Sequence, residues 1–201
     1  MKPCQLLMAG GIAMPLLYAV TLLVAGLLYP GYSTIAQAPS ELGVAGAPCP
    51  QMFNTGVVVT AVSAIAGAID LIFGLQRLGS GGFLAVLTGV SMALLGLAMA
   101  MAGLFPLPNP LHYGFGLTMA GLFTPLLGAL ALRRVGNIAA FRWFLFVAFV
   151  AGPILLAINL GAGAVMTTSH AGLWLRALAL VCFPAIGLLC WKTIVLVSRA
   201  S

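Results

Sequence analysis

The chain has 201 residues, of which 63% are hydrophobic and only 5% are charged, and its mean hydropathy is +1.20. A soluble domain carries about 25% charged residues, so this composition excludes an ordinary soluble protein and indicates one that dissolves in lipid. The net charge of +6 does not indicate nucleic-acid binding, because the eight Lys and Arg residues are scattered beside apolar runs.

Apolar segments long enough to cross a bilayer, each of about 20 residues, recur along the chain. The first is longer than the apolar part of a secretory signal, which has about 7–15 residues, so we interpret it as a membrane helix. The later connections are short, which suits antiparallel neighbours. The predicted fold is all-α: one membrane domain over residues 1–201, a polytopic helical bundle with six transmembrane helices. The predicted spans cover residues 6–28, 53–75, 83–104, 114–132, 141–160 and 173–197.

The longest connection, residues 29–52, is rich in Pro and Gly and too apolar for a free tail. Pro and Gly fix the backbone path, and Ser40 and Glu41 favour a helical turn. Tyr29 and Tyr32 suit the membrane interface. We therefore expect an ordered exterior loop that lies over the bundle and brings Glu41 toward the histidines.

Basic residues are distributed unevenly between the two sides of this predicted bundle. Arg176 alone falls on one side, whereas the other side receives Lys2, Arg77, Arg133, Arg134, Arg142, Lys192 and Arg199. Because cytoplasmic connections carry an excess of Lys and Arg, both termini are predicted to be cytoplasmic.

Few polar side chains remain for chemistry, and with this orientation they gather at the exterior boundary. Glu41 is the only glutamate, His112 and His170 are the only histidines, and Arg176 lies beside them in the predicted topology. Ionisable groups at a membrane often mark functional sites. One interpretation is a polar pocket for a lipid headgroup or small ligand, in which Arg176 meets an anionic group. The structural alternative pairs Glu41 with Arg176 and lets the histidines bond loop backbone.

Metal ligation by Glu41, His112 and His170 is not favoured, because these residues come from three connections and no local motif joins them. The sequence identifies no cofactor. It also contains no nucleophile elbow, P-loop or dinucleotide fingerprint. A membrane enzyme at the exterior interface stays an alternative, and its nucleophile beside a histidine would be one of three serines: Ser33, Ser40 or Ser169.

Asp70, the other carboxylate, falls within the second predicted span. We interpret it as a structural residue that faces the bundle near Arg77, with a proton relay as the alternative. The cysteines show no CxxC pair, so we interpret them as packing residues.

The connection over residues 29–52, which we call the first loop, also carries a family resemblance. Its matching residues are Tyr29-Pro30-Gly31-Tyr32-Ser33, Gln37, Ser40-Glu41-Leu42-Gly43, Gly46, Pro48 and Phe53-Asn54, and weaker matches follow at Phe105-Pro106, His112, Gly172 and Arg176. With these residues the chain resembles a family of small bacterial and archaeal integral membrane proteins known as domain of unknown function 998. The resemblance implies six membrane helices in a prokaryotic inner (cytoplasmic) membrane. It also adds Tyr32, Ser33, Gln37 and Asn54 to the candidate pocket, whereas Thr34 and Leu175 depart from the family pattern.

Two functions follow as hypotheses. The first is an exterior pocket that binds or modifies a lipid or lipid-like ligand, and a distant similarity of the first loop to eukaryotic proteins of lipid remodelling and autophagy regulation also implies lipid handling. The second is a non-catalytic structural or accessory subunit of a larger membrane complex. It is suggested by small residues at four-residue spacing, such as Ser63, Gly67, Gly96 and Ala100, which permit close helix contact. The expected partners are membrane lipids and, for the second function, membrane proteins, but not nucleic acid.

Overall fold

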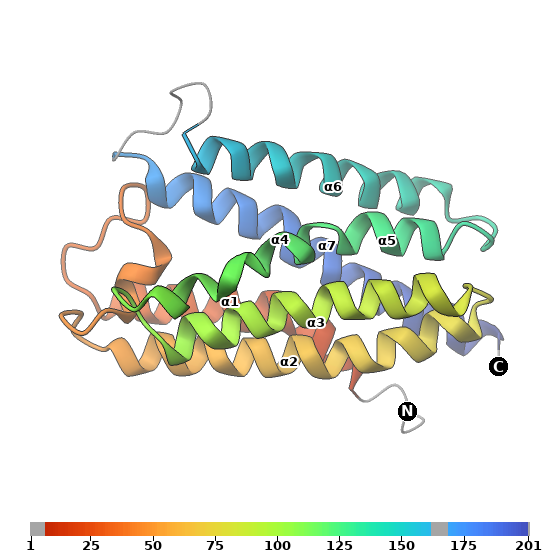
Figure 1. Cartoon of the computed structure of the whole chain (residues 1–201), viewed down its shortest axis with the longest axis horizontal. Helices are drawn as coiled ribbons and strands as arrows, with labels where there is room; N and C mark the ends of the chain where they lie inside the picture. The colour runs from red at the N-terminus through yellow and green to blue at the C-terminus, as the bar shows by residue number, and fades with distance from the viewer. Residues whose placement is uncertain (1–6, 162–168, 201) are drawn as a thin grey trace.

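The computed structural model describes residues 7–161 and 169–200, which leaves Lys2 and Cys4 outside the described residues. The described part of the chain is helical and has no β-strand, as predicted, and its long helices run side by side along the longest axis (Figure 1). The elements are α1 (Met8–Leu27), η2 (Pro39–Gly43), α2 (Pro50–Arg77), α3 (Gly82–Leu104), η3 (Pro110–Gly116), α4 (Thr118–Leu122), α5 (Thr124–Ala131), α6 (Ala139–Asn159) and α7 (Ala171–Ala200).

Among the described residues, five helices are long and apolar enough to cross a membrane: α1, α2, α3, α6 and α7. Together they identify an integral, multi-pass membrane protein. The fourth predicted span, residues 114–132, does not form one continuous helix. It begins within η3, where Gly114 and Phe115 have positive φ, and continues as the two short helices α4 and α5.

The break between α4 and α5 lies beside a proline and is bonded by a residue of α3. Pro125 has no N–H, so it cannot donate to a carbonyl in the preceding turn. At the same break, the hydroxyl of Ser91 in α3 donates to the carbonyl of Ala120, which also accepts from the N–H of Phe123, and lies 2.9 Å from the hydroxyl of Thr124. Hydroxyls of a neighbouring helix commonly bond backbone carbonyls where a membrane helix is interrupted. Apolar content, which predicted an unbroken helix, contains neither the missing donor of Pro125 nor this contact with α3.

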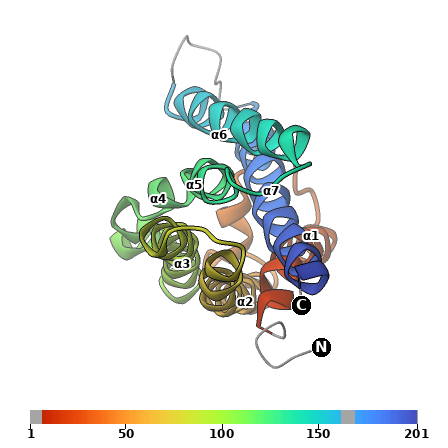
Figure 2. The same cartoon turned by 90° about the vertical axis from the view of Figure 1, so that its right-hand side faces the viewer.

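The two ends of the bundle differ in character. We call one the loop end, formed by residues 28–49, 105–117 and 169–170, and the other the basic end, where Arg77, Arg133, Arg134 and Arg199 lie. In Figure 1, α1 begins and α7 ends toward the basic end. Figure 2 shows that α7 lies between α1 and α6, and that α6 is at the periphery.

Small residues allow the helices to approach closely inside this chain. A Cβ on Gly67 of α2 would lie 2.5 Å from the backbone nitrogen of Gly11 in α1, and one on Gly96 of α3 would lie 3.0 Å from the carbonyl oxygen of Ala61 in α2. These glycines therefore serve contacts between helices of the same chain.

Asp70 has a structural contact at the start of α1. The residue is buried, and its Oδ2 accepts a hydrogen bond of 3.2 Å from the backbone N–H of Met8. Because a helix leaves its first N–H groups without partners of its own, the carboxylate satisfies one of them and fastens α1 to α2.

Candidate functional site

Arg176, in the second turn of α7, fastens the first loop to this helix. Its Nη1 donates to the carbonyl oxygens of Thr34 at 2.6 Å, Gln37 at 3.0 Å and Gly172 at 3.0 Å, and its Nη2 donates to the hydroxyl of Tyr32. All four acceptors are neutral. The guanidinium therefore closes a long-range contact without having its charge neutralised by these partners.

Gly172 allows the loop to reach α7. Its N–H donates to the carbonyl of Ala36 at 3.3 Å, and the N–H of Leu173 donates to that of Ile35 at 2.9 Å, so loop carbonyls satisfy the first amides of the helix. A Cβ on Gly172 would lie 2.1 Å from the carbonyl oxygen of Gln37 and 2.6 Å from Nη1 of Arg176. Gly172 and Arg176 thus belong to one contact.

Tyr32 lies between Arg176 and the loop backbone. Its hydroxyl donates to the carbonyl of Ala38 at 3.1 Å, and the guanidinium carbon of Arg176 is 5.5 Å from the ring centroid, within the range of a cation–π contact. Burial raises the pKa of the Tyr32 phenol, and the hydrogen bond and charge of Arg176 partly oppose that rise. The phenol is therefore protonated at neutral pH, so it both accepts from Arg176 and donates to Ala38.

Glu41 holds the loop together from within. Its two carboxylate oxygens accept hydrogen bonds from the backbone N–H of Ala38 at 2.7 Å and from Nε2 of Gln37 at 3.1 Å. Oε1 of Gln37 in turn accepts from the N–H of Ser33 at 2.8 Å, and Oγ of Ser33 accepts from the N–H of Ala36 at 3.2 Å. Glu41 therefore does not pair with Arg176 directly, because its carboxylate turns toward the start of η2. The two residues are connected through Gln37, whose side chain donates to Glu41 and whose carbonyl accepts from Arg176.

Asn54 connects the end of η2 to the first turns of α2. Its Nδ2 donates to the carbonyl of Gly43 at 3.0 Å, while its buried Oδ1 has no hydrogen-bond partner among the described residues. This side chain therefore sets the position of the loop where it enters α2.

The two histidines lie in different surroundings. Nδ1 of His112 is 3.1 Å from the carbonyl oxygen of Ala102 and 3.2 Å from that of Phe105, so the side chain bonds the last turn of α3. His170 is exposed, and its Nδ1 is 3.0 Å from Oγ of Ser169. Within the described ranges, no three His, Cys, Asp or Glu side chains are grouped closely enough to hold a metal ion, so Glu41, His112 and His170 do not form a ligand set.

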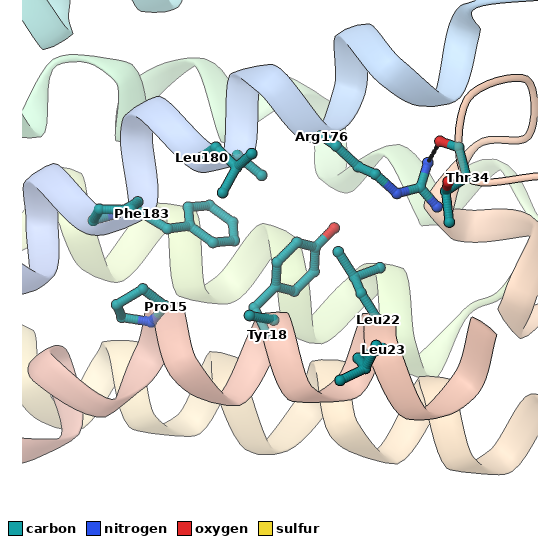
Figure 3. Close-up of a pocket in the computed structure, with 11 residues that line it drawn as sticks. Pro15, Tyr18, Leu22, Leu23, Thr34, Arg176, Leu180 and Phe183 are labelled. Atoms are coloured by element: carbon teal, nitrogen blue, oxygen red, sulfur yellow. Dashed lines mark hydrogen bonds between the residues drawn. The ribbon is translucent and has the colours of Figure 1, made fainter. Parts of the chain in front are cut away.

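An apolar cavity of about 270 Å³ lies between α1 and α7, and Arg176 and Thr34 line its loop end. Figure 3 shows Tyr18 and Leu22 reaching from α1 toward Leu180 and Phe183 of α7, with Arg176 beyond them on the side of the loop. Arg176 is the only residue with a formal charge among the residues that line this cavity.

A second cavity of about 500 Å³ lies on the other side of Tyr18 and Phe183, which line both cavities and have ring centroids 4.9 Å apart. His112 and Ser40 are part of its lining. The four residues predicted to share one pocket therefore separate: Arg176 and His112 line neighbouring cavities, Glu41 stabilises the loop, and His170 lies outside both linings.

Sequence reasoning missed Tyr18 and Phe183, although they line both cavities. The available signal was weak: Tyr18 is the single tyrosine within the first predicted span, but aromatic residues are common in membrane helices.

The model of one protein family, described as a protein of unknown function (DUF998), matches residues 12–192. The chain belongs to the DUF998 family. The match extends from α1 into α7 and so includes the first loop, Arg176 and both cavities of this DUF998 protein. Comparisons with curated proteins and with solved structures give no match.

Proposed function

We propose that this DUF998 protein binds an anionic amphiphile, a membrane lipid or a lipid-like molecule, in the cavity between α1 and α7. The observation that carries the proposal is the combination of an apolar wall with a single cationic group at one end. Such a cavity matches a molecule with a hydrocarbon chain and an anionic headgroup.

The position of the cavity favours a ligand that enters from the bilayer. Leu23 and Leu180 belong to its lining, yet 63% and 71% of their respective surfaces remain accessible. Exposed leucines on membrane-crossing helices face hydrocarbon, so the cavity opens sideways to the acyl chains. The hydrocarbon chain of a ligand then exchanges one apolar environment for another. The contact between the headgroup and Arg176 therefore provides the preference for an anionic lipid.

Arg176 has the capacity to bind an anion while it holds the loop. Its guanidinium has five N–H groups, and the contacts within the described residues involve only Nη1 and Nη2. The Nε–H and the second hydrogen on Nη2 remain for a phosphate or carboxylate. An anionic partner also compensates a charge that the loop contacts leave without a counterion.

The proposal includes a membrane orientation. α4 and α5 together form the fourth of six crossings, and residues 1–201 form a single membrane domain. The basic end faces the cytoplasm with both termini, because Lys and Arg concentrate on that side. The loop end is then exterior, and the membrane is the inner membrane of a prokaryote.

Native mass spectrometry of the purified protein with phosphatidylglycerol and phosphatidylcholine of equal chain length tests the binding. We expect the wild type to retain phosphatidylglycerol preferentially, and Arg176→Gln and the cavity-filling Leu180→Trp to lose that preference. Arg199→Gln removes the same charge at the basic end and is expected to behave as the wild type. Equal retention of both lipids by the wild type, or an unchanged preference in Arg176→Gln and Leu180→Trp, contradicts the proposal.

The accessory-subunit hypothesis stays a prediction, but part of the sequence argument for it is removed. Gly67 and Gly96, two of the small residues that suggested it, are used for contacts within the chain. Purification from native membranes distinguishes the two functions, since an accessory subunit copurifies with a stable protein partner.

A further inference from the structure

The cavity of about 500 Å³ differs from the Arg176 cavity in its polar lining. Its volume is within the range of about 300–1,000 Å³ that small-molecule sites usually have. Its polar lining residues are Tyr18, Ser40, His112, Tyr113 and Thr118, and no Asp, Glu, Lys or Arg lines it. An ionic headgroup here would be buried without a counterion, which is costly.

The contacts of His112 decide which of its nitrogens carries the proton. Nδ1 is within hydrogen-bond distance of the carbonyl oxygens of Ala102 and Phe105. Carbonyl oxygens only accept, so Nδ1 must donate and therefore carries the hydrogen. In the neutral ring, Nε2 then has a lone pair and is an acceptor. No hydrogen bond joins Nε2 to any of the described residues, while the ring lines the cavity.

We propose that this cavity is a second binding site, specific for an uncharged amphiphile whose polar end is a hydroxyl group, such as a diacylglycerol. The hydroxyl donates to Nε2 of His112, and Ser40, on the η2 side of the cavity, offers a further hydroxyl. The apolar part packs against α2, α3 and α7 through residues such as Phe53, Met99 and Leu175.

The chemistry of this site distinguishes it from that of the Arg176 cavity. A phosphate group would place its negative charge beside the lone pair of Nε2, and no Lys or Arg lines the cavity to neutralise it. A quaternary ammonium group has no hydrogen to donate to Nε2. A neutral hydroxyl meets both requirements, because it donates one hydrogen bond and adds no charge. The proposal does not depend on anion binding at Arg176, so either site can fail without the other.

The test uses the purified full chain and two probes, 1,2-dioctanoylglycerol and its 3-O-methyl ether, which lacks the donor hydrogen. We expect the ether to bind about tenfold more weakly to the wild type, which corresponds to about 1.4 kcal/mol. His112→Asn keeps an N–H that can donate to the carbonyls of α3 but has no equivalent of Nε2. It is expected to bind the alcohol about as weakly as the wild type binds the ether.

His170→Asn is the matched control, since His170 is exposed and lies outside the lining of this cavity, and it is expected to retain the preference for the alcohol. Equal affinity of the wild type for alcohol and ether overturns the proposal, and this comparison decides the question even if His112→Asn fails to fold. Undiminished alcohol binding by a folded His112→Asn also overturns it. Dioctanoyl phosphatidate that competes with the alcohol at equal affinity contradicts the argument from charge.

Discussion

Gly172→Ala is predicted to detach the first loop from α7. The new Cβ would lie 2.1 Å from the carbonyl oxygen of Gln37 and 2.8 Å from that of Thr34, and both oxygens accept hydrogen bonds from Arg176. Real Cβ atoms essentially never lie closer than 3.0 Å to another atom, so the loop has to move by roughly 1 Å. That movement also lengthens the hydrogen bond from the Gly172 N–H to Ala36, which is already 3.3 Å long.

The cost of Gly172→Ala follows from the bonds that this movement breaks. A hydrogen bond from a charged group contributes about 1.5–3 kcal/mol, and overpacking costs about 1–3 kcal/mol. Because the two effects overlap at one contact, we expect a total loss of about 2–4 kcal/mol in the free energy of unfolding. For a chain of this length that corresponds to a decrease in Tm of at least about 4 °C.

Thermal unfolding in detergent and hydrogen exchange of the amides at residues 33–41 measure the effect. Gly46→Ala is the matched control in the same loop, because a Cβ on Gly46 would meet no atom within 4 Å. We expect Gly46→Ala to keep the Tm and the amide exchange rates of the wild type. If Gly172→Ala matches Gly46→Ala in both measurements, the contact between the loop and α7 does not fasten the loop as described.

Three further substitutions test other contacts by thermal unfolding. Tyr32→Phe removes the hydroxyl between Arg176 and the carbonyl of Ala38, and should cost about 1 kcal/mol; an unchanged Tm would contradict this role. Ser91→Ala leaves the Ala120 carbonyl without the hydroxyl that bonds it at the break before α5, so we expect a loss of about 1–2 kcal/mol, whereas no change would mean that the hydroxyl is dispensable. Gly67→Ala places a methyl group against the backbone of Gly11, and should cost about 1–3 kcal/mol unless α1 and α2 can separate freely.

The sequence predicted the helical membrane fold and family correctly, because long apolar runs and a specific loop string are local signals. Within the first loop, the polar side chains of Ser33, Gln37 and Glu41 bond to backbone and to one another over short sequence separations. Contacts of this kind follow from neighbouring residue types.

The remaining features depend on contacts between distant segments. The break after α4 is bonded by Ser91 of α3, and the separation of His112 from Arg176 depends on how η3 folds against α3. Nothing in the sequence distinguishes Tyr18 and Phe183 from other aromatic residues of apolar spans. Only the packing of α1 against α7 places them between two cavities. The pattern of one segment does not contain this information.

A structure determined in nanodiscs that contain phosphatidylglycerol tests the central claim most directly. The account predicts continuous density in the cavity between α1 and α7, with a chain beside Leu23 and Leu180 and a headgroup within hydrogen-bond distance of Arg176. Density in the same place after Arg176→Gln should be weakened or lost. A cavity that contains no lipid in the wild type, or a lipid whose headgroup lies away from Arg176, would contradict the account.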